Sequence, residues 1–219
     1  MSNRFFITVL VVIAVVVGAF AFAKHSSNSK HNSANAGAPT NHTDGSTKSG
    51  VVLIEYGDYQ CSACYQYEPL VKAVREKYKD QIIVQFRNFP ITSKHPNAFA
   101  AARAAEASAK QNKFWEMHDK LYETQDPGGQ TGWVASSNPA VFFVSFAEGL
   151  GLDKTKFQSD MNSSAVNNLI LADMAAGQKV PVEGTPTFVL DGKKVEQNPR
   201  NIEGFNKLID DAIAAHQKQ

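Results

Sequence analysis

Cys61 and Cys64 are the only cysteines in this chain of 219 residues, and two residues separate them. Two thiolates at this spacing can exchange electrons with another disulfide, or they can supply half of the four ligands of a zinc site. The sequence contains no second Cys-x-x-Cys and no His-x-x-x-His. His95 and His118 are single histidines far apart in the sequence, and we expect both to be surface or capping residues. A redox pair is therefore favoured, and we expect no bound metal and no cofactor.

The elements around the pair explain how a thiolate could be stabilised there. A short apolar run with β-branched residues predicts a strand at 51–56, and apolar residues at steps of three and four predict a helix at 62–78. A cysteine at a helix start meets free amide N–H groups and the positive end of the helix dipole, which lower the pKa of its thiol. We expect Cys61 to be the exposed attacking thiol and Cys64 the buried resolving one.

The remaining pattern predicts an α/β domain interrupted by helices. A strand at 82–89 completes a β-α-β unit, for which parallel pairing is usual. Near the end, a strand at 187–190, the Asp191-Gly192 turn and a strand at 193–195 predict a hairpin before a closing helix. Between these parts, helices are expected at 97–110, 113–124, 140–149, 154–161 and 165–177. The sequence thus predicts a domain in two parts, 50–92 and 179–219, around a helical insertion at 93–178.

An apolar leader precedes this domain. Residues 5–23 carry no charge, and a spanning helix needs about 20 apolar residues, so an uncleaved anchor within 1–23 is favoured. Ala21-Phe22-Ala23 has the form of a signal-peptidase site, which keeps a cleaved signal peptide as the alternative. Residues 24–49 contain no large apolar side chain and predict a flexible linker. We expect a single-pass protein of the cell membrane with its folded domain outside the cytoplasm.

Charge excludes one class of partner. The formal net charge is +1 and acidic residues alternate with basic ones, so the sequence predicts no basic surface for nucleic acid.

Several stretches in this order resemble the bacterial disulfide-forming DsbA family, and most closely its membrane-anchored members in Gram-positive-type envelopes. They are EYGDYQCSAC, FRNFP, KFWEMHDKLYETQ and VEGTPTFVLDG, within residues 50–217. The resemblance implies a thioredoxin-like fold with a helical insertion. It also implies that Cys61 is the nucleophile, that Cys64 resolves, and that Pro186 is a cis-proline facing the disulfide with Thr185 contacting the substrate backbone.

Glu55 matches a buried acid that the family keeps beneath the disulfide. A carboxyl group inside an apolar strand should have a raised pKa and could take the proton of the resolving thiol. A surface-facing Glu on an edge strand is the alternative. Pro186 also has an alternative interpretation, as an ordinary trans-proline that begins an edge strand.

The resemblance implies a dithiol oxidase that acts on cysteine-containing exported proteins and is reoxidised by a quinone-linked membrane partner. The strongest oxidants of the family carry Pro-His between their cysteines, whereas this chain carries Ser62-Ala63, so we expect a weaker oxidant. A reductase or isomerase of the same fold stays open, and so does a copper(I) metallochaperone that uses the two thiolates.

Overall fold

The computed structural model describes residues 37–46 and 48–218. The expected anchor within residues 1–23 and the first part of the expected linker, residues 24–36, lie outside this range. Within the described range, every helix is too short or too polar to cross a bilayer.

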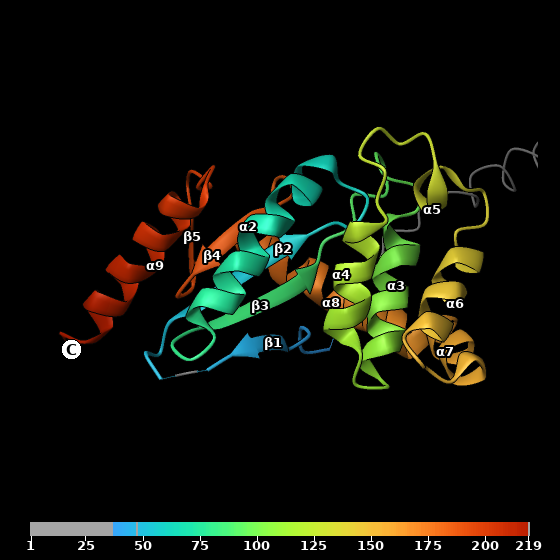
Figure 1. Ribbon diagram of the computed structural model, residues 1–219, viewed down its shortest axis with the longest axis horizontal. Helices are drawn as coiled ribbons and strands as arrows, with labels where there is room; N and C mark the ends of the chain where they lie inside the picture. Colours follow the sequence, from blue (N-terminus) through green and yellow to red (C-terminus); the bar gives the residue numbers. More distant parts are fainter. Residues whose placement is uncertain (1–36, 47, 219) are drawn as a thin grey trace, which may run out of the picture. The chain divides into compact units, whose positions relative to one another are not determined.

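Apart from the strand His42–Gly45 and the helix Gly132–Ala135, which were not predicted, the strands and helices follow the order predicted from the sequence (Figure 1). The strands are β1 (His42–Gly45), β2 (Val52–Gly57), β3 (Ile83–Asn88), β4 (Thr187–Leu190) and β5 (Lys193–Lys194). The helices are α2 (Ser62–Tyr78), α3 (Ala98–Ala109), α4 (Phe114–Glu123), α5 (Gly132–Ala135), α6 (Ala140–Gly149), α7 (Lys154–Met161), α8 (Ser164–Lys179) and α9 (Ile202–His216).

The strands form one mixed sheet in the order β1-β3-β2-β4-β5. β2 and β3 run parallel, as expected for a β-α-β unit, and β4 runs antiparallel to both β2 and β5. Asp191 and Gly192 both have positive φ, 48° and 77°, which suits the tight turn between β4 and β5. The predicted α/β architecture, β-α-β first and β-β-α last, is confirmed.

Alternate residues of β2 face the two sides of the sheet. Leu53 packs with Val71 of α2 and Phe205 of α9 in one buried cluster. On the other side, Tyr56 meets α8 at Gly177, where a Cβ atom would lie 3.2 Å from the Tyr56 ring and 2.7 Å from the Phe89 ring. The close approach of α8 to the sheet therefore depends on glycine at position 177.

The prediction of a flexible linker through residue 49 is wrong for its last part. β1 pairs antiparallel with β3, and the backbone N–H and hydroxyl of Thr40 donate to the buried Asp173 carboxylate at 2.7–2.9 Å. The His42 ring stacks on Phe114 with centroids 3.6 Å apart. An edge strand held by backbone and polar contacts needs no large apolar side chain, so composition did not reveal it.

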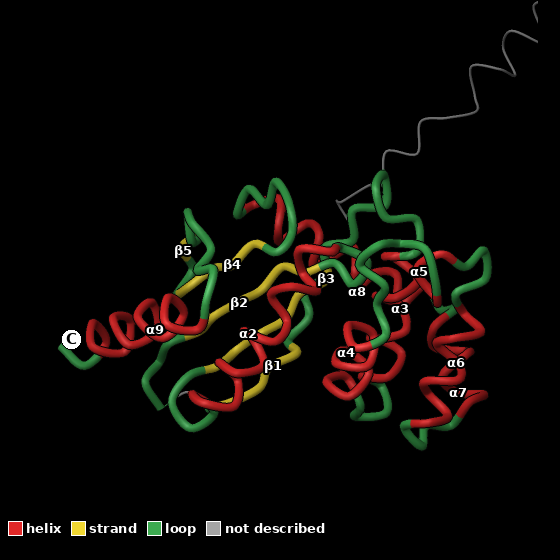
Figure 2. Tube along the Cα trace, turned by 45° about the horizontal axis from the view of Figure 1, so that its top comes forward, coloured by secondary structure: helices red, strands yellow, loops and turns green. Residues whose placement is uncertain are grey.

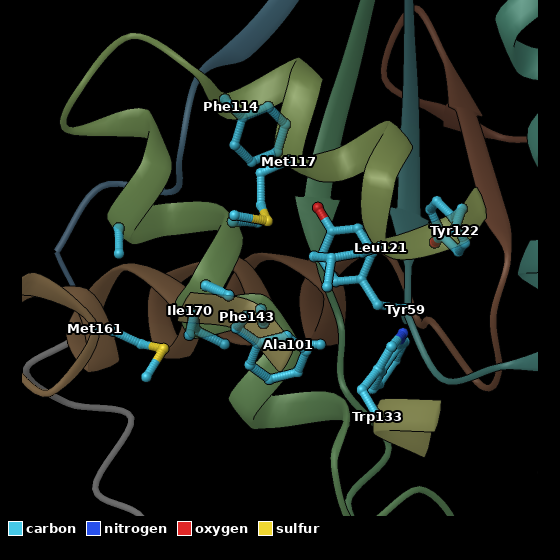
Figure 3. Close-up of a cluster of buried hydrophobic side chains, with 14 of the residues drawn as sticks. Tyr59, Ala101, Phe114, Met117, Leu121, Tyr122, Trp133, Phe143, Met161 and Ile170 are labelled. Atoms are coloured by element: carbon cyan, nitrogen blue, oxygen red, sulfur yellow. The ribbon is translucent and has the colours of Figure 1, made fainter. Parts of the chain in front are cut away.

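The helical insertion packs around α3, whose alanines let neighbouring helices approach closely. Ala101 lies among larger side chains from α4, α5, α6 and α8, as Figure 3 shows, and these include Met117, Trp133, Phe143 and Ile170. α5 is an additional short helix in the stretch between the helices predicted at 113–124 and 140–149. Figures 1 and 2 both place α9 at the opposite end of the domain from α6 and α7.

Candidate active site

Cys61 is the N-cap residue of α2 and joins that helix to the turn that follows β2. Its backbone is extended, with φ −76° and ψ 122°, and its side chain makes no capping hydrogen bond. As the N-cap residue, Cys61 stands next to the free amide N–H groups of the first turn of α2. Both cysteines are free thiols, and Cys61 is 8% exposed whereas Cys64 is fully buried. Cys61 is the more accessible sulfur, although it is less exposed than the sequence suggested.

The loop before β4 covers Cys61. The Thr185–Pro186 peptide bond is cis, as the family resemblance implied. In its thiol form, Cys61 Sγ donates to the Thr185 carbonyl oxygen at 3.4 Å. Two further hydrogen bonds hold this loop, from Thr187 Oγ1 to the Gly184 carbonyl at 2.7 Å and from Asn198 Nδ2 to the Pro186 carbonyl at 2.8 Å.

The two thiols have opposite acidities. Hydrogen bonds from the Cys64 thiol, from the Thr185 side chain and from the backbone N–H groups of Cys64 and Ala63 lower the pKa of Cys61 to about 5, against the effect of burial. Burial and the hydrogen bond given to Cys61 raise the pKa of Cys64 well above its usual value. At neutral pH the reduced pair therefore holds a Cys61 thiolate beside a neutral Cys64 thiol, which is the state of an attacking and a resolving cysteine.

Glu55 lies on the face of β2 that α2 covers. In the sheet it is paired with Phe86 on one side and Phe188 on the other, so its surroundings are apolar. Burial raises the pKa of Glu55 to about 8, which the positive charge of Arg75 opposes and the Cys61 thiolate reinforces. The buried position preferred from the sequence is present, and a carboxyl of this acidity can exchange a proton at neutral pH.

A second buried carboxyl group, that of Glu68, is absent from the residues expected from the sequence. Burial raises the pKa of Glu68 to about 7, which the positive charge of His118 opposes. Glu68 stands on the same face of α2 as Cys64, Val71 and Tyr78, which are all buried. The helical periodicity contained this signal, because Glu68 occupies a position of the apolar stripe.

His118 also differs from expectation, since it is fully buried rather than a surface or capping residue. Its ligand atoms and those of Glu68 and Asp119 lie within 4.8 Å of one another, so this group could hold a metal ion. However, Arg75 Nη1 lies 3.0 Å from Asp119 Oδ1 and Lys72 Nζ lies 3.3 Å from Asp119 Oδ2. Two side-chain cations already balance the acids, and we assign no metal to the group.

Gln125 supports the turn that carries the nucleophile. Its side-chain amide donates to the Tyr59 carbonyl at 2.6 Å and to the Cys61 carbonyl at 3.2 Å. Gln125 closes the stretch KLYETQ, so the resemblance contained this residue, but nothing in its spacing indicated a contact with Cys61.

The structure thus brings together the five residues predicted from the sequence, Cys61, Cys64, Glu55, Thr185 and Pro186. Their individual roles in catalysis stay predictions. Together they can carry out thiol–disulfide exchange, since they provide a thiolate nucleophile, a buried resolving thiol and a carboxyl group that can move a proton.

Comparisons with known proteins agree with this geometry. The family model described as Thioredoxin matches residues 37–211. A probable disulfide bond formation protein D of Bacillus anthracis is 28% identical over 212 residues, which are 94% of this chain and 92% of that protein. The crystal structure of oxidised BdbD from Bacillus subtilis superimposes with a TM-score of 0.68 at 20% identity, over 82% of this chain and 97% of that one.

A second kind of relative carries a different name. A protein named Na(+)/H(+) antiporter NhaA 3, of Salinispora tropica, is 36% identical over 176 residues, which are 80% of this chain and 25% of that protein. The chain therefore spans about a quarter of the length of these antiporter relatives.

Proposed function

Since the chain belongs to the thioredoxin family and is a DsbA-like thiol–disulfide oxidoreductase, we propose that it is a dithiol oxidase that introduces disulfide bonds into exported proteins. The observation that carries the proposed direction is the unequal acidity of the two thiols. A stabilised Cys61 thiolate favours the reduced pair over the disulfide, and a disulfide that is less stable gives up its oxidising equivalents more readily.

Two successive thiol–disulfide exchanges would transfer the disulfide from the chain to its substrate. In the oxidised state a substrate thiolate attacks Cys61 Sγ, the Cys61–Cys64 bond breaks, and the leaving Cys64 sulfur takes a proton, for which Glu55 is the proposed donor. A second substrate thiolate then attacks the substrate sulfur of this mixed disulfide, and Cys61 leaves as a thiolate. The substrate loses two electrons as its disulfide forms, and the enzyme gains them as a thiolate and a thiol.

Reoxidation and location complete the proposal. A quinone-linked membrane partner would return the Cys61–Cys64 disulfide, and residues 5–23 would anchor the chain as a single-pass protein with its catalytic domain outside the cytoplasm. Support comes from the length of the apolar stretch and from the similarity to a protein named for disulfide bond formation. A tether of this kind would raise the effective concentration of the domain near membrane partners.

The reduction potential of the full-length chain tests the direction of electron flow. The reference values are about −120 mV for the oxidant DsbA and about −270 mV for thioredoxin. We expect a value above about −180 mV, measured against glutathione buffers with Cys61→Ala as the control that cannot form the disulfide. A value near that of thioredoxin would remove the oxidase proposal and favour a reductase or isomerase, which the missing histidine between the cysteines would then explain.

A further inference from the structure

Asp58, three residues before Cys61, holds a loop that is distant in the sequence. Its fully buried carboxylate accepts hydrogen bonds from the backbone N–H of Gln60 and Ile91, both at 2.8 Å, and lies 2.7 Å from His95 Nδ1. The His95 side chain is 22% exposed. Asp58 and His95 therefore form a pair with one buried member and one member that solvent can reach.

The backbone of Asp58 is tied to both cysteines. Its carbonyl oxygen accepts from the Cys61 N–H at 3.0 Å, and hydrogen bonding by its backbone opposes the rise in the pKa of Cys64 that burial causes. A second contact fixes the same two segments, because the Asn97 N–H donates to Gln60 Oε1 at 2.7 Å. The loop 91–97 is thus fastened to the turn 58–61 immediately before the nucleophile.

This arrangement poses an electrostatic difficulty that His95 can resolve. A buried carboxylate three residues from Cys61 opposes a second negative charge on the sulfur. We propose that His95 is a positioning residue whose imidazolium balances the Asp58 carboxylate and so allows the Cys61 thiolate to form beside it. The inference rests on the redox chemistry of Cys61 and Cys64 that the proposed function assigns, but it does not depend on the direction of electron flow.

The charges that face His95 support this role. The hydrogen bond to Asp58 raises the pKa of His95, the charges of Asp58 and the Cys61 thiolate add to that rise, and burial and Lys94 oppose it. When Cys61 and Cys64 form a disulfide, the negative charge on Cys61 disappears. The pKa of His95 is then expected to fall, so His95 releases part of a proton on oxidation and takes it up on reduction.

The wild-type chain offers the first test. The Cε1 proton of His95 is followed by NMR as a function of pH, in the full-length chain, with the cysteines reduced and then oxidised. We expect a higher His95 pKa in the reduced form. His216 is the matched control, because it also pairs with an aspartate, Asp191, at 3.0 Å, and its Cε1 proton signal should be the same in the reduced and oxidised forms. Equal values for His95 in both forms would overturn the proposal.

Variants provide the second test. We expect His95→Gln to raise the pKa of Cys61, measured by thiolate absorbance near 240 nm, by about one unit, a tenfold change in the proton affinity of the thiolate. Replacing the carboxylate as well, in Asp58→Asn/His95→Gln, should return the value toward wild type, whereas His216→Gln should leave it unchanged. A purely structural role for His95 predicts no such recovery.

The pH dependence of the reduction potential separates this inference from the proposed function. In the wild-type chain the potential should fall more steeply with pH between the two His95 pKa values than in His95→Gln, because reduction there takes up an additional fraction of a proton. A thioredoxin-like potential with the steeper segment present would remove the oxidase proposal and keep the role of His95. An oxidising potential whose pH dependence is identical in the wild type and in His95→Gln would keep the oxidase proposal and remove the role of His95.

Discussion

The Cys61 sulfur lies 3.4 Å from the carbonyl oxygen of Thr185, the residue that precedes the cis-proline Pro186. Residues 124 positions apart in the sequence thus meet at the reacting atom. The Thr185 side chain also helps to lower the pKa of Cys61, after the larger effect of Cys64. The loop that covers the nucleophile therefore also contributes to the acidity of the Cys61 thiol.

Removing the Thr185 hydroxyl should make the Cys61 thiolate less stable and so raise the pKa of Cys61. A hydrogen bond to a charged group contributes about 1.5–3 kcal/mol, so Thr185→Val is expected to raise the pKa of Cys61 by about one to two units. Thiolate absorbance as a function of pH measures this change. The Thr185 hydroxyl is buried and has no other hydrogen-bond partner among the described residues, so it is free to bond the thiolate. Thr124→Val is the control, because it removes a hydroxyl that donates to the Lys120 carbonyl at 2.7 Å in α4. An unchanged Cys61 pKa in Thr185→Val would show that the loop contributes nothing to the acidity of the thiol.

The two cysteines should behave differently when each is replaced singly. Cys64→Ser keeps Cys61, and the serine hydroxyl can replace the Cys64 thiol as a hydrogen-bond donor to it, but the variant has no resolving thiol. Mixed disulfides between Cys61 and substrate should therefore accumulate. Cys61→Ser leaves only a buried thiol of raised pKa, and few or no mixed disulfides are expected. Non-reducing gels with mass spectrometry distinguish the two outcomes. Equal trapping by both variants would contradict the assignment of the attacking sulfur.

Glu55 should make stability fall as pH rises. The pKa of Glu55 is about 8 in the folded chain and 4.5 in its unperturbed state, so the folded state holds more protons between these values. At pH 7 this difference in pKa lowers the free energy of unfolding by about 3 kcal/mol relative to low pH, where Glu55 is protonated in both states. We expect Glu55→Gln to be more stable than wild type at pH 7, but not at pH 4, by denaturant unfolding of the reduced chains.

The same variant should not lose all of the pH dependence, since burial also raises the pKa of Glu68 to about 7 and that of Asp173 to about 6. Glu183→Gln, at a side chain that is 87% exposed, provides a control that should follow the wild type. If Glu55→Gln and wild type show the same profile, Glu55 does not hold its proton in the folded chain.

β1 and Thr40 should contribute directly to stability. A chain that begins at residue 50 lacks the Thr40 contacts to Asp173 and the His42 contact to the buried Glu106, 2.9 Å away. Both carboxyl groups would lose partners and, among the described residues, keep only their hydrogen bonds from Asn88. Each hydrogen bond lost by a buried charged group costs about 1.5–3 kcal/mol. We expect a chain beginning at residue 50 to unfold at a clearly lower urea concentration than one beginning at residue 37. Coincident unfolding curves would mean that β1 is only an accessory strand.

Periodicity and turn chemistry predicted most of the fold. The helices at 62–78, 140–149 and 154–161 agree with their predicted limits, because each has a clear amphipathic or apolar pattern between boundary residues. The family resemblance also indicated Glu55 and Pro186, and the apolar strand around Glu55 supported its burial. The hairpin at Asp191-Gly192 followed from local turn preferences alone.

The features that the sequence did not predict are polar contacts between segments far apart in the chain. β1 is held by Thr40 and His42, residue types that are usually solvated, and the contact between Asp58 and His95 joins loops 37 residues apart. A single sequence fixes the period of an element but not which loop lies beside which. Polar partners across such loops become visible only once the sheet order and the helical insertion are known.

The two buried clusters have a consequence for how this protein can vary. Cys61 and Cys64 belong to the cluster built mainly from α3, α4, α6 and α8, whereas Leu53, Val71 and Phe205 belong to the separate cluster between the sheet, α2 and α9. Substitutions that accumulate in the insertion over evolution can therefore shift the cysteine environment while the second cluster keeps the sheet intact. The inserted helices are then a region in which redox properties can diverge among relatives without loss of the scaffold.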